Sequence, residues 1–237
     1  MGGTRAEVPV CRLFDLHYGR PMTDFARLRR AMVDSQVRVN DVTDPRIIDA
    51  MLDIPRERFV PASRAGLAYL DEDLPLGSGR YLIEPMVLAK LVHALALTDN
   101  DRVLDVGCAT GYGAALLSRL AGRVVAVEEE PELASAAKRL LAELAPGVSL
   151  VVGPLTAGAP GEGPFDAILI EGAIETVPEA LVRQLEEGGR LAAVVGSGGM
   201  GRATLHVRAG RVLSQRPVFD AAVPPLPGFA LPRQFVF

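Results

Sequence analysis

The sequence is poor in several residue types that mark particular classes of protein. Its 237 residues include no tryptophan, two cysteines (Cys11 and Cys108) and three histidines. Two cysteines are too few for a disulfide framework, so a reducing cytoplasm is the simplest expected compartment. The histidines, His17, His93 and His206, lie far apart along the chain and lack the spacing of metal ligands. We therefore expect no metal site.

Two further absences concern positive charge and long apolar segments. The formal net charge is −4, whereas a general nucleic-acid-binding protein carries a basic face. No apolar run approaches the roughly 20 residues that cross a membrane, and the N-terminus lacks the basic-then-apolar layout of a secretory signal. We expect neither nucleic acid nor a membrane as a partner.

The composition is that of a globular chain with a sizeable core. Hydrophobic residues make up 49% of the sequence and charged residues 23%, which suits one α/β domain with an appendage. We divide the chain into an N-terminal tail whose order the sequence does not determine (1–21), a helical cap with a substrate-side segment (22–84) and a Rossmann-like core with a C-terminal hairpin (85–237). The sequence leaves the oligomeric state open.

Alternating strand and helix patterns define the expected fold. From about Pro85 to Val195 short apolar strands alternate with helical segments, which predicts a doubly wound, mostly parallel α/β sheet. Residues 202–208 and 211–219 alternate around Ala209-Gly210, which predicts an antiparallel hairpin at the sheet's edge.

The most informative segment is Arg102–Glu130. A buried strand (103–106) leads through a glycine turn into a helix (112–120), and a second buried strand (123–127) ends in acidic residues. This is a strand–loop–helix–strand nucleotide-binding unit. Glu128 follows Gly107 by about 20 residues, the spacing at which an acid meets a ribose hydroxyl in such units.

The glycine spacing indicates which nucleotide is bound. Gly107, Gly111 and Gly113 follow Asp105 in an order that differs from the dinucleotide pattern G-x-G-x-x-G. This order resembles the first motif of S-adenosylmethionine-dependent methyltransferases. A carboxylate at position 105 suits the cofactor's ammonium and sulfonium groups and would repel a phosphate. We therefore expect S-adenosyl-L-methionine as the cofactor.

Ligands of open α/β sheets bind beyond the carboxyl ends of the strands, and this places the expected cofactor residues. We expect Glu128 to accept hydrogen bonds from the ribose, and the backbone near Gly107–Thr110 to meet the methionine tail. The expected cofactor-binding set is Asp105, Gly107, Cys108, Ala109, Thr110, Gly111, Glu128, Glu129, Gly153, Leu155 and Glu171.

Six segments in order carry a more specific resemblance, to the protein-L-isoaspartate O-methyltransferases. They are Ile48–Val60, Leu74–Gly79, Glu84–Ala89, Asp105–Gly113, Pro164–Ile170 and Leu185–Leu191. The likeness runs from about Met22 to Val223. It implies that the chain methylates the carboxylate of isoaspartyl residues in damaged proteins, a repair reaction that uses S-adenosylmethionine in the cytosol. The implied partner is a protein or peptide acceptor.

The sequence departs from this family at two positions. The family places a serine of a Thr-Ile-Ser-x-Pro pattern at the substrate carboxylate, and Ile83 stands there in this chain. The family's acid for the adenine amino group is replaced by Pro154. Losing one hydrogen bond to a charged group costs about 1.5–3 kcal/mol, so a slow enzyme remains compatible with the sequence.

The acceptor side is expected at Tyr81, Leu82, Ile83 and Glu84. We assign no catalytic nucleophile or base, because an ionised carboxylate needs only to be brought into line with the methyl group. Two alternatives stay open. One is a methyltransferase with a different acceptor, for which Tyr81, Leu82 and Ile83 form an apolar wall; the other is a weakly active or inactive protein that binds the cofactor or a partner.

Overall fold

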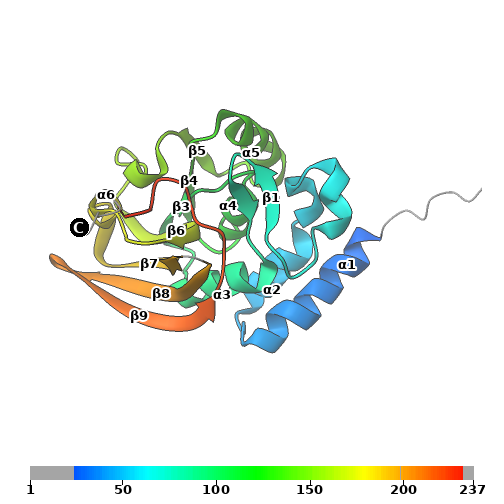
Figure 1. Ribbon diagram of the computed structural model, residues 1–237, viewed down its shortest axis with the longest axis horizontal. Coiled ribbons are helices and arrows are strands. Elements are labelled where there is room, and N and C mark those ends of the chain that lie inside the picture. The colour runs from blue at the N-terminus through cyan, green and yellow to red at the C-terminus, as the bar shows by residue number, and fades with distance from the viewer. Residues whose placement is uncertain (1–23, 198, 232–237) are drawn as a thin grey trace, which may run out of the picture.

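The computed structural model describes residues 24–197 and 199–231, and within them a seven-stranded sheet forms the centre of the molecule (Figure 1). The strand order is β5-β4-β3-β6-β7-β8-β9, parallel from β5 to β7 and antiparallel at β8 and β9. The predicted mostly parallel sheet with a C-terminal antiparallel hairpin is confirmed. The strands are β3 (Arg102–Val106), β4 (Arg123–Glu128), β5 (Ser149–Val152), β6 (Phe165–Ile174), β7 (Leu185–Ser197), β8 (Met200–Ala209) and β9 (Val212–Ala221).

Successive residues of the central strands enter two different apolar cores. Val103 packs on one face of the sheet, while Leu104 and Val106 pack on the other. A strand buried on both faces reads as a continuous apolar run, which is why the sequence pattern identified it. The first face is covered by α1 (Phe25–Met32), α2 (Pro45–Asp53), α3 (Pro85–Leu95), α4 (Tyr112–Leu117) and α5 (Pro131–Leu144).

The second face is covered by shorter pieces. These are the turn Leu155–Ala157, the one-turn helix α6 (Glu179–Val182) and the C-terminal segment that contains Leu226 and Phe229. Helix α6 has only four residues, and Leu185 soon after it begins β7. No described helix is long and apolar enough to cross a membrane.

The helical cap precedes the sheet in the chain and begins within the described residues. Asp24 caps α1 by accepting from the Arg27 N–H at 3.0 Å, and Asp44 caps α2 in the same way through the Arg46 N–H at 2.9 Å. The helical path after α1 continues through a π-turn, Val33–Val37. The predicted tail, residues 1–21, lies outside the described residues.

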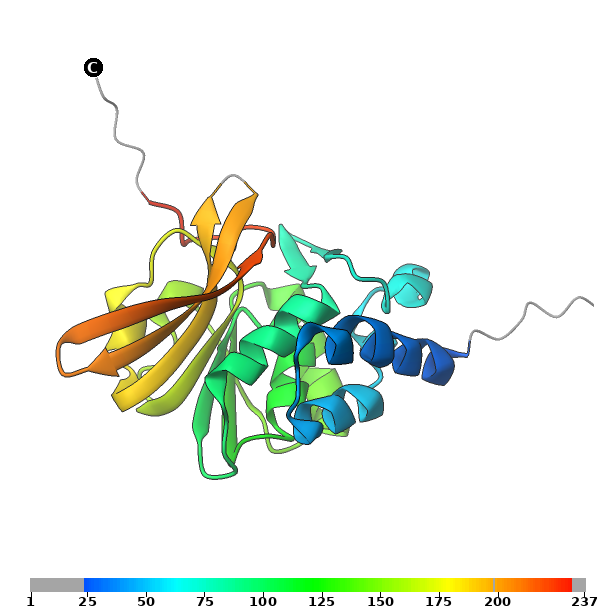
Figure 2. The same cartoon turned by 90° about the horizontal axis from the view of Figure 1, so that it is seen from below.

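A small hairpin joins the cap to the core. Strands β1 (Leu74–Gly77) and β2 (Arg80–Leu82) pair with each other in a separate two-stranded sheet. Figure 2 shows this hairpin near the end of the central sheet and beside the C-terminal segment. The hairpin therefore carries residues 80–82 towards the carboxyl ends of β3 and β4.

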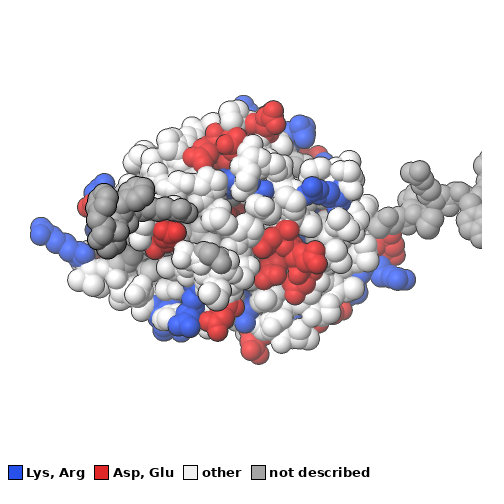
Figure 3. Space-filling model, in the orientation of Figure 1, with Lys and Arg blue, Asp and Glu red and all other residues white. Residues whose placement is uncertain are grey.

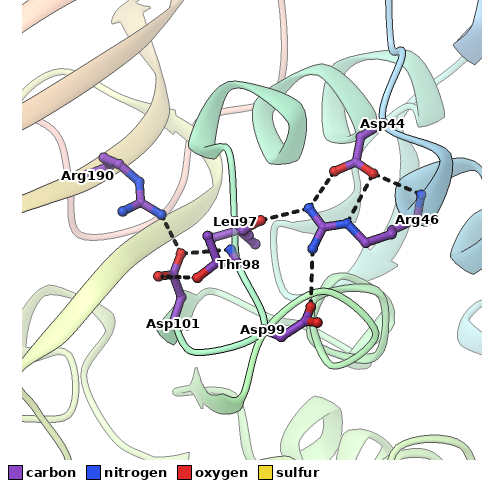
Figure 4. Close-up of polar contacts among 7 residues, drawn as sticks. All are labelled: Asp44, Arg46, Leu97, Thr98, Asp99, Asp101 and Arg190. Atoms are coloured by element: carbon purple, nitrogen blue, oxygen red, sulfur yellow. Dashed lines mark hydrogen bonds and ion pairs between the residues drawn. The ribbon is translucent and has the colours of Figure 1, made fainter.

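Polar contacts fasten the opposite, amino end of the sheet (Figure 4). Arg46 of α2 donates to the Leu97 carbonyl at 2.7 Å. Asp101, which is 8% exposed, accepts from the Thr98 N–H at 3.1 Å and from the Arg190 guanidinium of β7. These contacts join the cap, the turn before β3 and the strand β7. They lie far from the carboxyl ends of the strands, where ligands bind.

We expect Asp101→Ala to destabilise the protein without changing the ligand-binding edge. The change removes the acceptor of both Thr98 and Arg190, so the loss should be about 1.5–3 kcal/mol. Urea unfolding measures it. The control is Asp220→Ala, whose ion pair with Arg202 is exposed and contributes about 0–1 kcal/mol. Equal losses in the two variants would contradict a structural role for Asp101.

Candidate functional site

The glycine loop that follows β3 is held tightly against β4. The N–H groups of Gly107 and Cys108 donate to the Val127 carbonyl at 2.9 and 3.2 Å. Gly107 and Gly111 have φ of 81° and 95°, the left-handed region that glycine enters without steric cost. Ala109 also has a positive φ, 49°, which costs an L-residue about 1–2 kcal/mol. The loop is thus fixed in a strained and specific shape.

Three carboxyl groups gather at this loop from the ends of three strands. Asp105, Glu128 and Glu171 belong to β3, β4 and β6 and are 0%, 0% and 4% exposed. Gly113 makes the approach of Glu171 possible, because a Cβ there would stand 2.0 Å from the Glu171 Oε1 atom. All three acids were in the set predicted from the sequence, and the structure brings them together.

Asp105 and Glu171 form a buried carboxyl pair. Burial raises the pKa of Asp105 well above its usual range, and the nearby Glu171 and Glu128 carboxylates raise it further. Burial also raises the pKa of Glu171. Two carboxylates in one apolar site cannot both ionise cheaply. We therefore expect the pair to hold a proton near neutral pH.

The oxygen atoms of this pair receive no hydrogen bond from outside the pair. Apart from the proton that the two carboxyl groups hold between them, no described residue donates to either side-chain oxygen of Asp105 or to Oε1 of Glu171. Buried polar atoms are normally satisfied, so each exception calls for an explanation. Unpaired acceptors suit a ligand that carries an ammonium group or other N–H donors. In this respect the residues fit the predicted cofactor.

Glu128, in contrast, is fully engaged. Its carboxylate accepts from the N–H of Ala109 at 2.7 Å and of Glu129 and Glu130 at 3.0 and 3.1 Å. It also forms an ion pair with the Arg80 guanidinium at 3.2 Å. The contact with Ala109 explains how the strained alanine conformation is held. The carboxylate predicted to meet a ribose is thus paired within the protein.

Arg80 and Leu226 are site residues that the sequence analysis missed. Arg80, on β2, is 2% exposed and donates to the Gly107 carbonyl at 2.7 Å. A Cβ on Gly107 would stand 3.1 Å from the Leu226 side chain. The sequence did contain a signal for Arg80, which stands between Gly79 and the apolar run Tyr81–Ile83. An arginine that is buried with such a run needs a buried acid as its partner.

The remaining predicted cofactor residues lie on the same edge but serve structural contacts. The Thr110 hydroxyl donates to the Phe59 carbonyl at 2.6 Å, tying the loop to the cap. The Gly153 N–H donates to the Glu128 carbonyl at 3.1 Å. Leu155 is fully buried in the apolar core, so only its backbone is left for a ligand.

The predicted acceptor-side residues divide into buried and accessible ones. Leu82 and Ile83 are 2% and 1% exposed and pack in the core, while Tyr81 and Glu84 are half-buried. The Ile83 carbonyl accepts from the Arg56 guanidinium at 2.7 Å. The predicted apolar wall therefore needs correction, because only Tyr81 of its three members reaches the surface.

An acidic rim surrounds the β1–β2 hairpin. Glu84 donates its N–H to the Asp73 carboxylate at 2.9 Å. Partial burial, followed by the neighbouring Asp73 and Asp71 carboxylates, raises the pKa of Glu84 to about 7. Figure 3 shows acidic side chains gathered beside this hairpin. Within the described residues, no cluster of three or more His, Cys, Asp or Glu side chains is arranged to hold a metal.

The buried carboxyl pair predicts an unusual pH dependence of stability. A carboxyl whose pKa is raised on folding stabilises the fold at low pH, and this contribution is lost as the pH rises through the raised pKa. Glu171→Gln removes one titrating group and lets an amide donate to Asp105. We expect it to be about 1–3 kcal/mol more stable than the parent at pH 8, since each pKa unit corresponds to about 1.4 kcal/mol.

Chemical denaturation at pH 5, 6.5 and 8 measures this difference, which should shrink as the pH falls. Glu143→Gln is the control, because Glu143 is paired with Arg58 on the surface and should show no gain at pH 8. A Glu171→Gln variant that is less stable at every pH would contradict the description of the carboxyl pair.

Comparison with known proteins agrees with the family resemblance in the sequence. The family model of protein-L-isoaspartate(D-aspartate) O-methyltransferase matches residues 27–218. The chain is 45% identical over 179 residues to a protein-L-isoaspartate O-methyltransferase of Methylorubrum extorquens, covering 76% of this chain and 78% of the relative.

Solved structures agree in fold. One, a protein-L-isoaspartate O-methyltransferase, superposes with a TM-score of 0.72 and 28% identity over 85% of this chain and 65% of its own. A Plasmodium falciparum protein solved with S-adenosyl-L-homocysteine superposes with a TM-score of 0.68 and 18% identity, over 84% and 97%. With its Rossmann-like sheet, its glycine loop and these matches, the chain belongs to the protein-L-isoaspartate(D-aspartate) O-methyltransferase family, whose cofactor is S-adenosyl-L-methionine.

Proposed function

We propose that this family member transfers the methyl group of S-adenosylmethionine to a carboxylate of a protein acceptor, with isoaspartyl residues as the substrate to test first. The observation that carries the proposal is the buried Asp105–Glu171 pair beside the glycine loop, whose unpaired oxygens lack donors. When bound, the cofactor supplies a methyl group that its positive sulfur makes electrophilic. The chain's own residues bind and orient it.

Each part of the site has a proposed role. Asp105 and Glu171 would meet the ammonium of the methionine tail, because in the described part of the chain these two buried acids have oxygen atoms that receive no donor from outside the pair. Glu128, at the end of β4, would face the ribose. Pro154 offers no side-chain acceptor to the adenine amino group, so the base is held by fewer polar contacts.

The transfer itself needs no general base from the protein. An acceptor carboxylate is ionised at neutral pH, and its oxygen must only be aligned with the methyl group. Alignment of two reactants supplies up to about 7–11 kcal/mol of the barrier reduction. We therefore propose that the chain's residues act by position and electrostatics.

A specific observation favours a second candidate, a methyltransferase for a less acidic acceptor. The Ile83 side chain presents no hydroxyl, and the rim of Glu84, Asp73 and Asp71 is acidic. A negatively charged isoaspartyl group meets repulsion there, whereas an acceptor flanked by basic residues meets attraction. The two candidates share the cofactor and differ in the acceptor.

Methyl transfer from radiolabelled cofactor tests the proposed function. We expect transfer to an isoaspartyl peptide and none to the same peptide with ordinary aspartate. Calorimetry with S-adenosylhomocysteine measures binding separately. Binding without transfer to the isoaspartyl peptide would favour the second acceptor class. Absence of binding would leave only a partner-binding role.

The Ile83 side chain is 1% exposed, so the acceptor contact that the family resemblance implies there requires the acceptor to reach into this buried segment. If it does, restoring a hydroxyl at position 83 should improve the isoaspartyl reaction. We expect Ile83→Ser to raise the rate about tenfold, which corresponds to one hydrogen bond of about 1.4 kcal/mol. Removing a buried isoleucine should at the same time cost about 2–5 kcal/mol of stability. The assay is therefore run well below the variant's melting temperature.

The control is Ile83→Val, which enlarges the space without adding a hydroxyl and should cost only about 0.5–1.5 kcal/mol. It should show no rate gain. A folded Ile83→Ser variant without a gain would contradict the placement of residue 83 at the acceptor carboxylate.

The rate with an anionic acceptor should depend on the charge of Glu84. Because its pKa lies at about 7, Glu84 becomes neutral as the pH falls from 8 to 6, while the acceptor carboxylate stays ionised. We expect kcat/KM for the isoaspartyl peptide to rise over this interval. In the Glu84→Gln variant kcat/KM at pH 8 should exceed that of the parent, and the rise between pH 8 and pH 6 should be absent. The control variant Glu72→Gln should keep the rise.

A further inference from the structure

Arg80 makes the contacts that the sequence assigns to the cofactor. The ribose is expected at Glu128 and the methionine tail at the backbone of Gly107–Thr110. The Arg80 guanidinium instead lies 3.2 Å from the Glu128 carboxylate and donates to the Gly107 carbonyl at 2.7 Å. One side chain of the protein thus reaches both parts of the expected ligand site.

The arrangement is closed to solvent. The side chains of Arg80 and Glu128 are 1% and 0% exposed, and all residues from Gly107 to Gly111 are buried. A single Cβ atom added to Gly107 would stand 2.8 Å from Arg80 Nη2 and 3.1 Å from Leu226. A ligand that approaches Gly107 therefore needs Arg80 and Leu226 to move.

The hairpin that carries Arg80 is not hydrogen-bonded into the central sheet, although its Leu74 and Leu82 side chains pack in the core. Strands β1 and β2 pair only with each other, and their register is irregular between Pro75 and Gly77. The turn between them contains Gly77, Ser78 and Gly79, all with positive φ. Figures 1 and 2 show the hairpin beside the C-terminal segment that contains Leu226.

The charges of the site give a reason for the cofactor to replace the Arg80 guanidinium. Three buried carboxyl groups surround the loop, and Arg80 is the cation paired with Glu128. S-adenosylmethionine carries an ammonium and a sulfonium. It would therefore replace one buried positive charge with others, so that the acids stay compensated before and after binding.

We propose that Arg80 is an intramolecular latch, and that S-adenosylmethionine enters when the Arg80 guanidinium leaves Glu128 and the Gly107 carbonyl for solvent. This proposal rests on the cofactor use described under Proposed function. The latch lowers the apparent affinity by the fraction of molecules that are open. It also keeps the acids paired when no cofactor is bound.

The first test compares the affinity for S-adenosylhomocysteine by calorimetry. We expect Arg80→Ala to bind at least about tenfold more tightly than the parent, because the closed state no longer competes. Arg102→Ala is the matched control. Arg102 lies at the amino end of β3, where it donates to the Glu162 carbonyl at 2.9 Å, and its loss should leave the affinity unchanged.

The outcomes separate the latch from the proposed function. Equal or weaker binding by a folded Arg80→Ala variant overturns the latch while cofactor use stands. No binding by either protein overturns the proposed function and the latch with it. Because removal of one partner from a buried ion pair is strongly destabilising, the variant is first checked for folding.

A second test uses the unaltered chain and decides the matter if the variant does not fold. Phenylglyoxal modifies accessible arginines, and peptide mass spectrometry locates the products. We expect Arg80 to be unmodified in the free protein and modified with saturating S-adenosylhomocysteine. Arg56, which is 0% exposed, should stay unmodified in both. Continued protection of Arg80 in the complex overturns the latch.

Discussion

Compensation of buried negative charge governs the functional end of this molecule. Asp105, Glu128 and Glu171 are buried where three strands end, and isolated carboxylates in such a place are unfavourable by several kcal/mol each. The structure answers with three different means. Glu128 receives three N–H groups and the Arg80 guanidinium, while burial raises the pKa of both Asp105 and Glu171 so that the pair holds a proton.

The loop geometry follows from this constraint. Gly113 must lack a side chain because Glu171 occupies the space that its Cβ would fill. Gly107 must lack a side chain because Arg80 and Leu226 occupy the corresponding space. The glycines of a cofactor motif thus serve the protein's own side chains in this conformation. The space beside these glycines also suits a flat or cationic ligand once the protein's own side chains have moved out of it.

Both departures from the family lie outside the glycine loop. Position 83 is apolar and buried, with its carbonyl held by Arg56, and position 154 is a proline that opens the short turn containing Leu155. One departure thus lies on the acceptor side and the other where the adenine is expected, while the glycine loop and its acids keep the family pattern.

Local patterns determined much of the fold in advance. The alternation of apolar strands and helices, the hairpin at residues 202–219 and the acids at the ends of β3 and β4 were all predictable from the sequence, because each depends on neighbours within one element or one turn. The position of the cofactor site followed as well, since parallel strands end on a common side.

The sequence by itself determined the glycine loop and the three acids that lie beside it. Only the tertiary structure decided that Arg80 pairs with Glu128, that Leu226 covers Gly107 and that Ile83 faces the core. Arg80 and Leu226 belong to segments far from the loop in the chain, and no periodicity links them to it. Their contacts depend on how a separate hairpin and the C-terminal segment pack over the sheet's edge, which is a property of the folded chain alone.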